Sequence, residues 1–314
     1  MNEVLLTVLP IFALIGLGFG VGRARLIDAQ TSKGLAAFTF TLAIPAMLFR
    51  TMATAELPDV APAAIWLCFF GSAFATWMIA TALTIPVLRR PIADSAPIAM
   101  SASYGNVVMV GLPLALTSLG PDAAGPIALI LSAHSPTLFA VASLHLALTG
   151  AHRGESLTKI LVGVLNDLVR NPLIVAIIAG TLWRLTGLGL HPLADQTLEM
   201  LGRAAVPCAL VSLGLSLVGF QIAGQAPTLF SILVLKLAAM PAIAWVLADQ
   251  VFALPAPVAG VIILFAAMPT GANAYLFAQQ QGRAVNSASA SVALGTGLSL
   301  FTASIVLIVL NVTK

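Results

Sequence analysis

The chain has 314 residues, of which 60% are hydrophobic and only 8% are charged, and its mean hydropathy is +1.05. Soluble domains carry about 25% charged residues, so this composition excludes an ordinary soluble domain. The formal charge of +3 is small, and no stretch has the basic character of a nucleic-acid-binding segment. Cys68 and Cys208 lie in apolar segments, which indicates neither a disulfide framework nor a metal site.

Apolar segments recur along the whole chain and predict an all-α integral membrane protein. A chain of this length accommodates about ten spans of roughly 20 residues. No basic region precedes the first segment, so we expect it to be a span rather than a cleaved signal peptide. The predicted spans are 2–22, 34–52, 61–88, 95–118, 123–149, 168–187, 196–220, 226–252, 255–281 and 285–312.

The basic residues gather on one side of this arrangement. Nine of the 14 Lys and Arg residues follow the first, third, fifth or ninth span. They are Arg23, Arg25, Lys33, Arg89, Arg90, Arg153, Lys159, Arg170 and Arg283. The positive-inside rule makes that side cytoplasmic. With ten spans, both termini are then expected outside.

The two halves of the chain repeat each other. The residue numbers differ by 162 in each of four matched pairs, and LAIPAML around Pro45 aligns with AAVPCAL around Pro207. These pairs are Pro10 with Pro172, Gly18 with Gly180, Pro45 with Pro207, and Gly120 with Gly282. Because each half holds five spans, an odd number, the second half inserts upside down relative to the first. We therefore predict inverted repeats at 1–150 and 168–314, joined by a cytoplasmic linker at 151–167.

Two predicted spans, the fourth and the ninth, contain residues that interrupt a helix. Ser101–Leu119 holds Gly105, Asn106, Gly111 and Pro113, and Ala266–Gln279 holds Pro269, Gly271 and Asn273. Gly and Pro disturb the helical hydrogen bonds, and in lipid the freed backbone groups need cover from protein or a water-filled cavity. Two broken spans in corresponding halves are the best sequence indication of a transporter's binding site. Asn precedes Pro in the first motif and follows it in the second, so the two do not superpose at the offset of 162.

The broken spans supply the first candidate binding residues. Asn106 and Asn273 carry amides that donate and accept hydrogen bonds, and polar groups at membrane depth are costly unless used. The alternative is that they only satisfy the broken backbone. Gly105, Thr270 and Tyr275 lie beside them and are weaker candidates.

Buried charge is expected at one further position. Lys236 lies mid-way along the eighth span, whereas all eleven acidic residues map to loops or span ends. Its partners would be helix-end carbonyls or an anionic ligand, and it stands either in direct contact with substrate or in place of a bound cation. His134, mid-way along the fifth span, is either a packing residue or a proton relay. No cofactor or metal site is expected.

The chain resembles the bacterial members of the auxin efflux carrier family, within the bile acid:sodium symporter superfamily. The resemblance covers nearly the whole length and rests on IFALIGLGFGVGR, LAIPAMLF, GNVVMVGLPL, LKLAAMP and AMPTGANAYLFA. It implies a scaffold of spans 1, 2, 6 and 7 beside a transport domain of spans 3–5 and 8–10, whose fourth and ninth spans cross near mid-membrane. It also implies a homodimer formed through the scaffold, in the bacterial inner membrane.

The resemblance implies alternating-access transport of small organic anions such as malonate or auxin-like acids. Sodium- or proton-coupled symport of another small solute is an alternative, and a channel or a sensory membrane module is another. An intramembrane enzyme is disfavoured, because the chain has no HExxH and no aspartate-rich motif. His134 and Ser135 are sequence neighbours, so on a helix they point to different faces and do not form a nucleophile–base pair.

Overall fold

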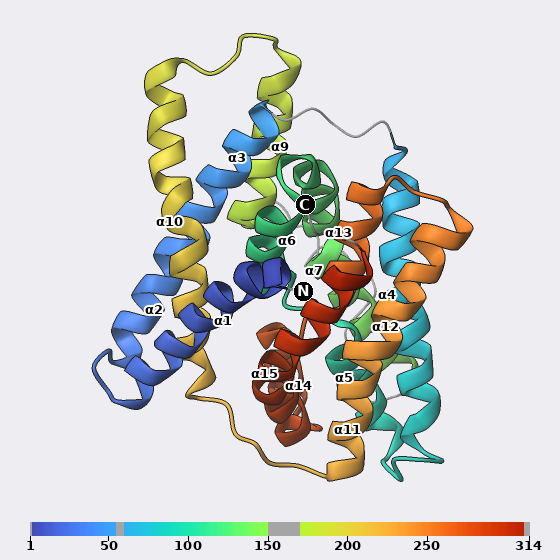
Figure 1. The fold of residues 1–314 in the computed structure, drawn as a ribbon. Helices are drawn as coiled ribbons and strands as arrows, with labels where there is room; N and C mark the ends of the chain where they lie inside the picture. The colour runs from blue at the N-terminus through green and yellow to red at the C-terminus, as the bar shows by residue number, and fades with distance from the viewer. Residues whose placement is uncertain (1, 55–59, 150–169, 311–314) are drawn as a thin grey trace.

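The computed structural model describes residues 2–54, 60–149 and 170–310, and the predicted linker at 151–167 lies outside them. Helices make up nearly all of the described part (Figure 1). In the first half these are α1 (Asn2–Arg23), α2 (Ala29–Phe38), η1 (Thr39–Ala43), α3 (Ile44–Thr54), α4 (Pro62–Thr84), η2 (Ile92–Asp94), α5 (Ser95–Ser103), η3 (Val107–Gly111), α6 (Leu112–Leu119), η4 (Pro121–Ala123) and α7 (Ala124–Leu148). In the second half they are α9 (Pro172–Leu185), α10 (Pro192–Leu217), α11 (Ala226–Val234), η5 (Leu235–Ala239), α12 (Met240–Trp245), η6 (Val246–Val251), α13 (Ala256–Ala266), α14 (Ala272–Gln281) and α15 (Val285–Val309).

Seven continuous helices in the described part are long and apolar enough to cross a membrane. Three shorter apolar helices accompany them: Val107–Leu119, Pro172–Leu185 and Ala256–Ala266. Two of these three belong to the predicted broken spans, where a helix stops and restarts. The chain is therefore a multi-pass membrane protein. The second segment begins earlier than expected, because the Asp28 side chain caps α2 by accepting a hydrogen bond from Thr31 N–H at 2.7 Å.

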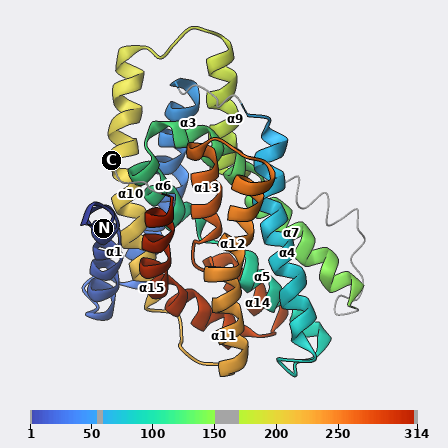
Figure 2. The ribbon, with the colours of Figure 1, turned by 45° about the vertical axis from the view of Figure 1, so that its right-hand side comes forward.

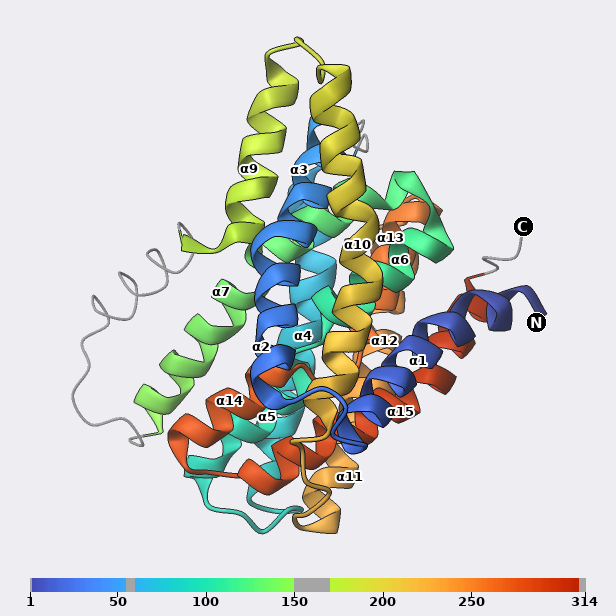
Figure 3. The same cartoon turned by 90° about the vertical axis from the view of Figure 1, so that its left-hand side faces the viewer.

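The helices form two groups that stand side by side. One contains α1, α2–α3, α9 and α10, which are at the left of Figure 1 in blue and yellow. The other contains α4–α7 and α11–α15, and the view in Figure 2 shows α4, α5 and α11–α12 running together there. In Figure 3, where the first group faces the viewer, α9 begins part-way along α10 rather than at its end.

Glycines allow the helices of the first group to approach very closely. A Cβ placed on Gly18 of α1 would lie 2.3 Å from Val211 O of α10, and one on Gly180 of α9 would lie 2.5 Å from Phe49 O of α3. Gly18 and Gly180 are partners in the sequence repeat, and the residue numbers of Phe49 and Val211 also differ by 162. The same offset of 162 residues therefore relates both residues of one close contact to both residues of the other.

Three of the four π-helical turns in the described part are followed directly by an α-helix, and each of these three ends two residues before a proline. Thr39–Ala43 precedes Pro45, Val107–Gly111 precedes Pro113, and Leu235–Ala239 precedes Pro241. In each turn a backbone N–H reaches the carbonyl five residues earlier; Ile44 N–H bonds Thr39 O, for example. Proline lacks an N–H and its ring clashes with the carbonyl four residues before it, so the chain widens there.

Asp94 is a buried carboxylate at the end of the molecule that holds Arg90 and Arg283. It is 4% exposed, and it pairs with Arg90 at 2.7 Å and with Arg283 at 3.1 Å. These pairs join the segment before α5 to the turn between α14 and α15. The position agrees with the expectation that acidic residues lie at span ends.

The close glycine contacts predict opposite effects for matched substitutions in α1. Gly18→Ala should lower the thermal unfolding temperature in detergent, because its Cβ would overlap the backbone of α10. Overpacking of this kind costs about 1–3 kcal/mol. Gly16→Ala meets nothing within 4 Å, so it should leave stability unchanged or raise it through the better helix propensity of Ala. Equal unfolding temperatures for the two variants would contradict the packing described.

Candidate functional site

The two interrupted segments lie against each other through their backbones. Gly105 and Thr270 form an isolated antiparallel bridge. Asn106 N–H donates to Pro269 O at 2.7 Å, and Gly271 N–H donates to Tyr104 O at 2.9 Å. Backbone groups freed where each helix stops are therefore satisfied by the other break, as a membrane interior requires.

Side chains satisfy the carbonyl ends of the two half-helices that lead into the breaks. Lys236 is fully buried, and its Nζ donates to Ala266 O, at the last residue of α13, at 2.6 Å. Met240 Sδ is its second partner, at 3.1 Å. Thr270 Oγ1 donates to Ser101 O near the end of α5 at 2.9 Å. The partial negative charge of both helix ends is thus met by a donor.

A cavity of about 600 Å³ lies beside the paired breaks. Its walls come from both helix groups, and among the described residues that line it Arg170 carries the only formal charge. The lining residues are Phe40, Thr41, Tyr104, Gly105, Asn106, Val107, Val108, Met109, Ser135, Arg170, Asn171, Pro172, Leu173, Gly271, Ala272 and Asn273.

The positive ends of three helices point to this cavity. The segments η3–α6, α14 and α9 all begin at residues that line it, near Asn106, Gly271 and Asn171. Helix N-termini carry partial positive charge and free N–H groups, which favour anions. Asn106 is only 6% exposed, and its Nδ2 has no hydrogen-bond partner among the described residues, whereas its Oδ1 accepts from Met109 N–H at 3.3 Å. The amide nitrogen of Asn106 is thus a buried, unused donor in a residue that lines the cavity, and such a donor suits an anionic ligand.

A hydrogen-bonded chain joins Asn273 to α7 across the cavity floor. Asn273 Nδ2 donates to Tyr104 Oη at 2.8 Å, and Tyr104 Oη lies 2.6 Å from Ser135 Oγ. The ring of His134 lies against Tyr104, with centroids 4.4 Å apart, and its Nε2 has no partner among the described residues. Tyr104 therefore connects the first break to α14 and α7.

The predicted site residues divide into three sets by position. Those at the cavity wall are Gly105, Asn106, Gly271 and Asn273, and those behind it, in the paired backbone, are Lys236, Pro269 and Thr270. Away from the wall are His134, Tyr275, Gly111 and Pro113. Tyr275 packs on Phe220, with ring centroids 5.0 Å apart. Gly111 and Pro113 lie in the helix beyond the break rather than at the break itself.

Five polar residues of the cavity wall were not predicted as site residues from the sequence: Thr41, Tyr104, Ser135, Arg170 and Asn171. Tyr104 is adjacent to the Gly105–Asn106 motif, and that adjacency was the available signal. Arg170 was counted among the cytoplasmic basic residues. Asn171 and Pro172 are the N-cap and first residue of α9, and a helix start of this kind is readable from the sequence.

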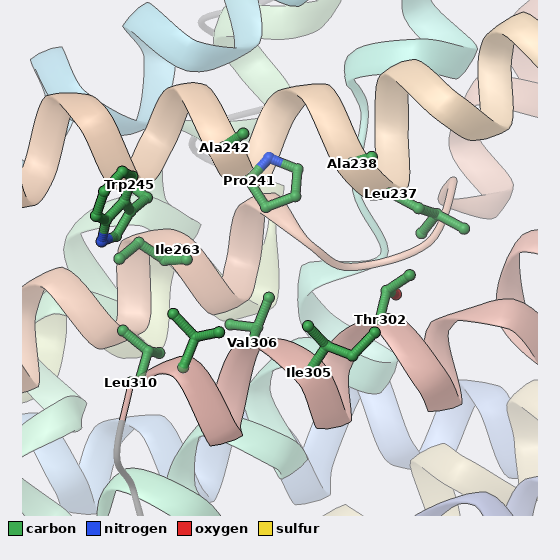
Figure 4. Close-up of a pocket in the computed structure, with 11 residues that line it drawn as sticks. Leu237, Ala238, Pro241, Ala242, Trp245, Ile263, Thr302, Ile305, Val306 and Leu310 are labelled. Atoms are coloured by element: carbon green, nitrogen blue, oxygen red, sulfur yellow. The ribbon is translucent and has the colours of Figure 1, made fainter.

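A second cavity, of about 370 Å³, lies between α12, α13 and α15. Figure 4 shows Pro241, Trp245, Ile263, Ile305 and Val306 around it. Its lining is apolar apart from Thr302 and the indole of Trp245, so it offers little to hold a carboxylate. Among the described residues no group of three or more His, Cys, Asp or Glu side chains could hold a metal ion.

Comparison with known proteins identifies the family. The model of a family described as "Membrane transport protein" matches residues 3–307. The chain belongs to this membrane transport protein family. That membership confirms the resemblance to the auxin efflux carriers, and it makes the chain a transport protein rather than an enzyme. A protein of Rhizobium meliloti (strain 1021) named "Putative malonate transporter" is 27% identical over 304 residues, which cover 96% of this chain and 94% of that protein.

Substitution of the cavity amides predicts a loss of ligand affinity. Asn106→Ala and Asn273→Ala should each weaken binding of the transported solute by about 1–3 kcal/mol, because hydrogen bonds at a desolvated site are removed. Asn106→Asp separates the two roles of this side chain: it keeps an oxygen to cap Met109 N–H but removes the amide donor, and should therefore fold yet bind an anion poorly.

Ligand affinity is measured by thermal-shift or counterflow titration of the purified variants. Asn286→Ala is the matched control, because Asn286 is exposed and does not line this cavity. Unchanged half-saturation in both folded alanine variants would place the ligand elsewhere.

Proposed function

We propose that the protein is a secondary active carrier of small organic anions, such as malonate or auxin-like carboxylates, working by alternating access. The solute would bind in the cavity beside the paired breaks. The observation that carries this proposal is the buried Asn106 amide without a partner, set among three helix N-termini. These groups provide fixed donors for a carboxylate as it loses water. The name of the Rhizobium relative supports the same substrate class.

Ten spans in two inverted repeats form the second part of the proposal. The equivalent contacts of Gly18 and Gly180 support a two-fold relation between the halves. The two breaks also correspond if the alignment of the halves is shifted locally. The first break, 104–106, comprises three residues, and the second, 267–271, comprises five. After the break, α14 is shorter than η3 and α6 together, which restores the offset of 162 at Gly120 and Gly282.

The scaffold would be α1, α2–α3, α9 and α10, with the transport domain formed by the remaining helices. The cavity takes Phe40, Thr41 and Leu173 from the first group and its break residues from the second. Rocking one group against the other would then expose the cavity to either side of the membrane. We place the protein in the bacterial inner membrane with both termini outside and, by resemblance to the family, as a homodimer through the scaffold. A cysteine introduced at residue 154 tests the orientation, because it should be protected from an impermeant thiol reagent added to intact cells. Labelling from outside would show that the proposed orientation is the wrong way round.

The carrier proposal predicts saturable counterflow. Proteoliposomes loaded with unlabelled carboxylate should accumulate the labelled form transiently, because a carrier exchanges bound solute across the membrane. Empty liposomes and the Asn106→Asp variant are the controls. A non-saturating flux without counterflow would indicate a channel, and the absence of any flux or binding with a panel of carboxylates would refute the substrate class.

Lys236 would act as a fixed cation behind the binding site. In cation-coupled carriers, half-helix carbonyl ends and unwound carbonyls hold the ion. Here the ammonium of Lys236 meets the carbonyl end of α13. It also lies close to the first break, because a Cβ on Gly105 would be 3.4 Å from both Cε and Nζ. Its charge would favour an anion in the cavity through the intervening backbone.

Charge removal at Lys236 should therefore nearly abolish transport. Lys236→Gln keeps much of the length and hydrogen bonding but not the charge, whereas Lys236→Arg should retain partial activity at most because its guanidinium is wider. Lys33→Gln, an exposed position on α2, is the control. Uptake by the wild type should persist when potassium or choline replaces sodium. Strict sodium dependence, or normal transport by folded Lys236→Gln protein, would overturn the role assigned to Lys236.

A further inference from the structure

The cavity beside the breaks offers two chemically different kinds of polar group. The buried residue Asn106 and the starts of η3 and α14 provide neutral donors and helix-end partial charge. The exposed residue Arg170 provides a full positive charge. Apolar side chains, among them Phe40, Val108 and Leu173, line the space as well. A ligand that matches both kinds of group has two anionic groups and an aliphatic body.

The position of Arg170 is fixed by the start of α9. Asn171 is the N-cap residue, and its Oδ1 accepts from Leu173 N–H at 2.9 Å. Pro172 occupies the first turn and holds Asn171 in an extended conformation, with φ −75° and ψ 114°. Helix α9 is itself packed on α3 at Gly180, where its backbone approaches Phe49 closely. Arg170 is thus attached to the first helix group through the start of α9, whereas the breaks belong to the second group.

The balance of charge favours a dianion. No acidic side chain lines the cavity among the described residues, so a second carboxylate would meet no repulsion there. The donors of Asn106 and of the helix starts can satisfy one carboxylate of a ligand. A monocarboxylate bound in this way would leave Arg170 without an anion, whereas the planar guanidinium of Arg can hold a second carboxylate with two parallel hydrogen bonds.

We propose that Arg170 binds the second carboxylate of an aliphatic dicarboxylate and so makes the carrier selective for dicarboxylates over monocarboxylates. This inference rests on the proposed function, because it assigns a substrate class to the same cavity. It adds a role for Arg170 that neither the family nor the relative's name provides. Arg170 also connects substrate to α9, so a dicarboxylate would bridge the two helix groups.

The test compares acids of equal carbon number that differ by one carboxylate. Malonate is paired with propionate and succinate with butyrate, and affinities are measured by counterflow competition with purified full-length protein. Arg170→Gln should weaken malonate and succinate at least about tenfold, as expected for a lost hydrogen bond between charged groups. Propionate and butyrate should change by no more than about twofold. Arg170→Lys should recover part of the loss, because it restores charge without the planar fork.

Arg25→Gln is the matched control, because Arg25 is exposed in the turn after α1 and does not line the cavity. An unchanged ratio of dicarboxylate to monocarboxylate affinity in folded Arg170→Gln protein would overturn the inference, as would an equal loss for both acids. Neither result would affect the carrier assignment if Asn106→Asp still abolished binding. Absence of binding of all four acids to the wild type would instead refute both the inference and the proposed function.

Discussion

Two backbone hydrogen bonds hold the centre of this protein together, one from Asn106 N–H to Pro269 O and one from Gly271 N–H to Tyr104 O. A helix that stops within a membrane leaves donors and acceptors that lipid cannot satisfy, at a cost of several kcal/mol each. Each break is therefore tolerated only because the other is present. Thr270 and Lys236 complete the arrangement by capping the carbonyl ends of α5 and α13. With those ends neutralised, the helix starts at the cavity and the charge of Arg170 give it a positive character.

Proline positions explain much of the local geometry around this centre. Pro45, Pro113 and Pro241 each follow a π-helical turn, and these turns contain Thr41, Val107–Met109 and Lys236. An extra residue in a turn rotates the side chains that follow it relative to a regular helix. Thr41 and Val107–Met109 lie within such turns and line the cavity, whereas Lys236 reaches the carbonyl end of α13. Pro207 lies inside the continuous helix α10, so proline alone does not impose such a turn.

The sequence predicted the breaks, the amides Asn106 and Asn273 and the buried position of Lys236, because Gly, Pro and polar residues stand out within apolar spans. The sequence located the first break imprecisely. Gly111 and Pro113 were expected at the interruption, but the helix stops at Tyr104–Asn106, where the backbone pairs with the second break. The position at which the helix stops is decided by pairing with the second break, and the sequence of one segment alone does not carry that information. His134 and Tyr275 were selected for their chemistry, yet packing turns both away from the cavity wall.

Arg170 illustrates a different limit of sequence reasoning. Counting Lys and Arg by loop assigns it to the cytoplasmic surface together with Arg153 and Lys159, and the helix start at Asn171–Pro172 beside it does not by itself reveal a cavity. Its place becomes clear only when α9 is seen to begin part-way along α10 (Figure 3), beside the cavity rather than at the end of the bundle. The same short helix brings a third N-terminus to the cavity. Because α9 belongs to one helix group and the breaks to the other, the positive field of the cavity is assembled from both. A relative movement of the groups would therefore change the strength of anion binding as well as access to the site, without disturbing the paired backbone on which the site depends.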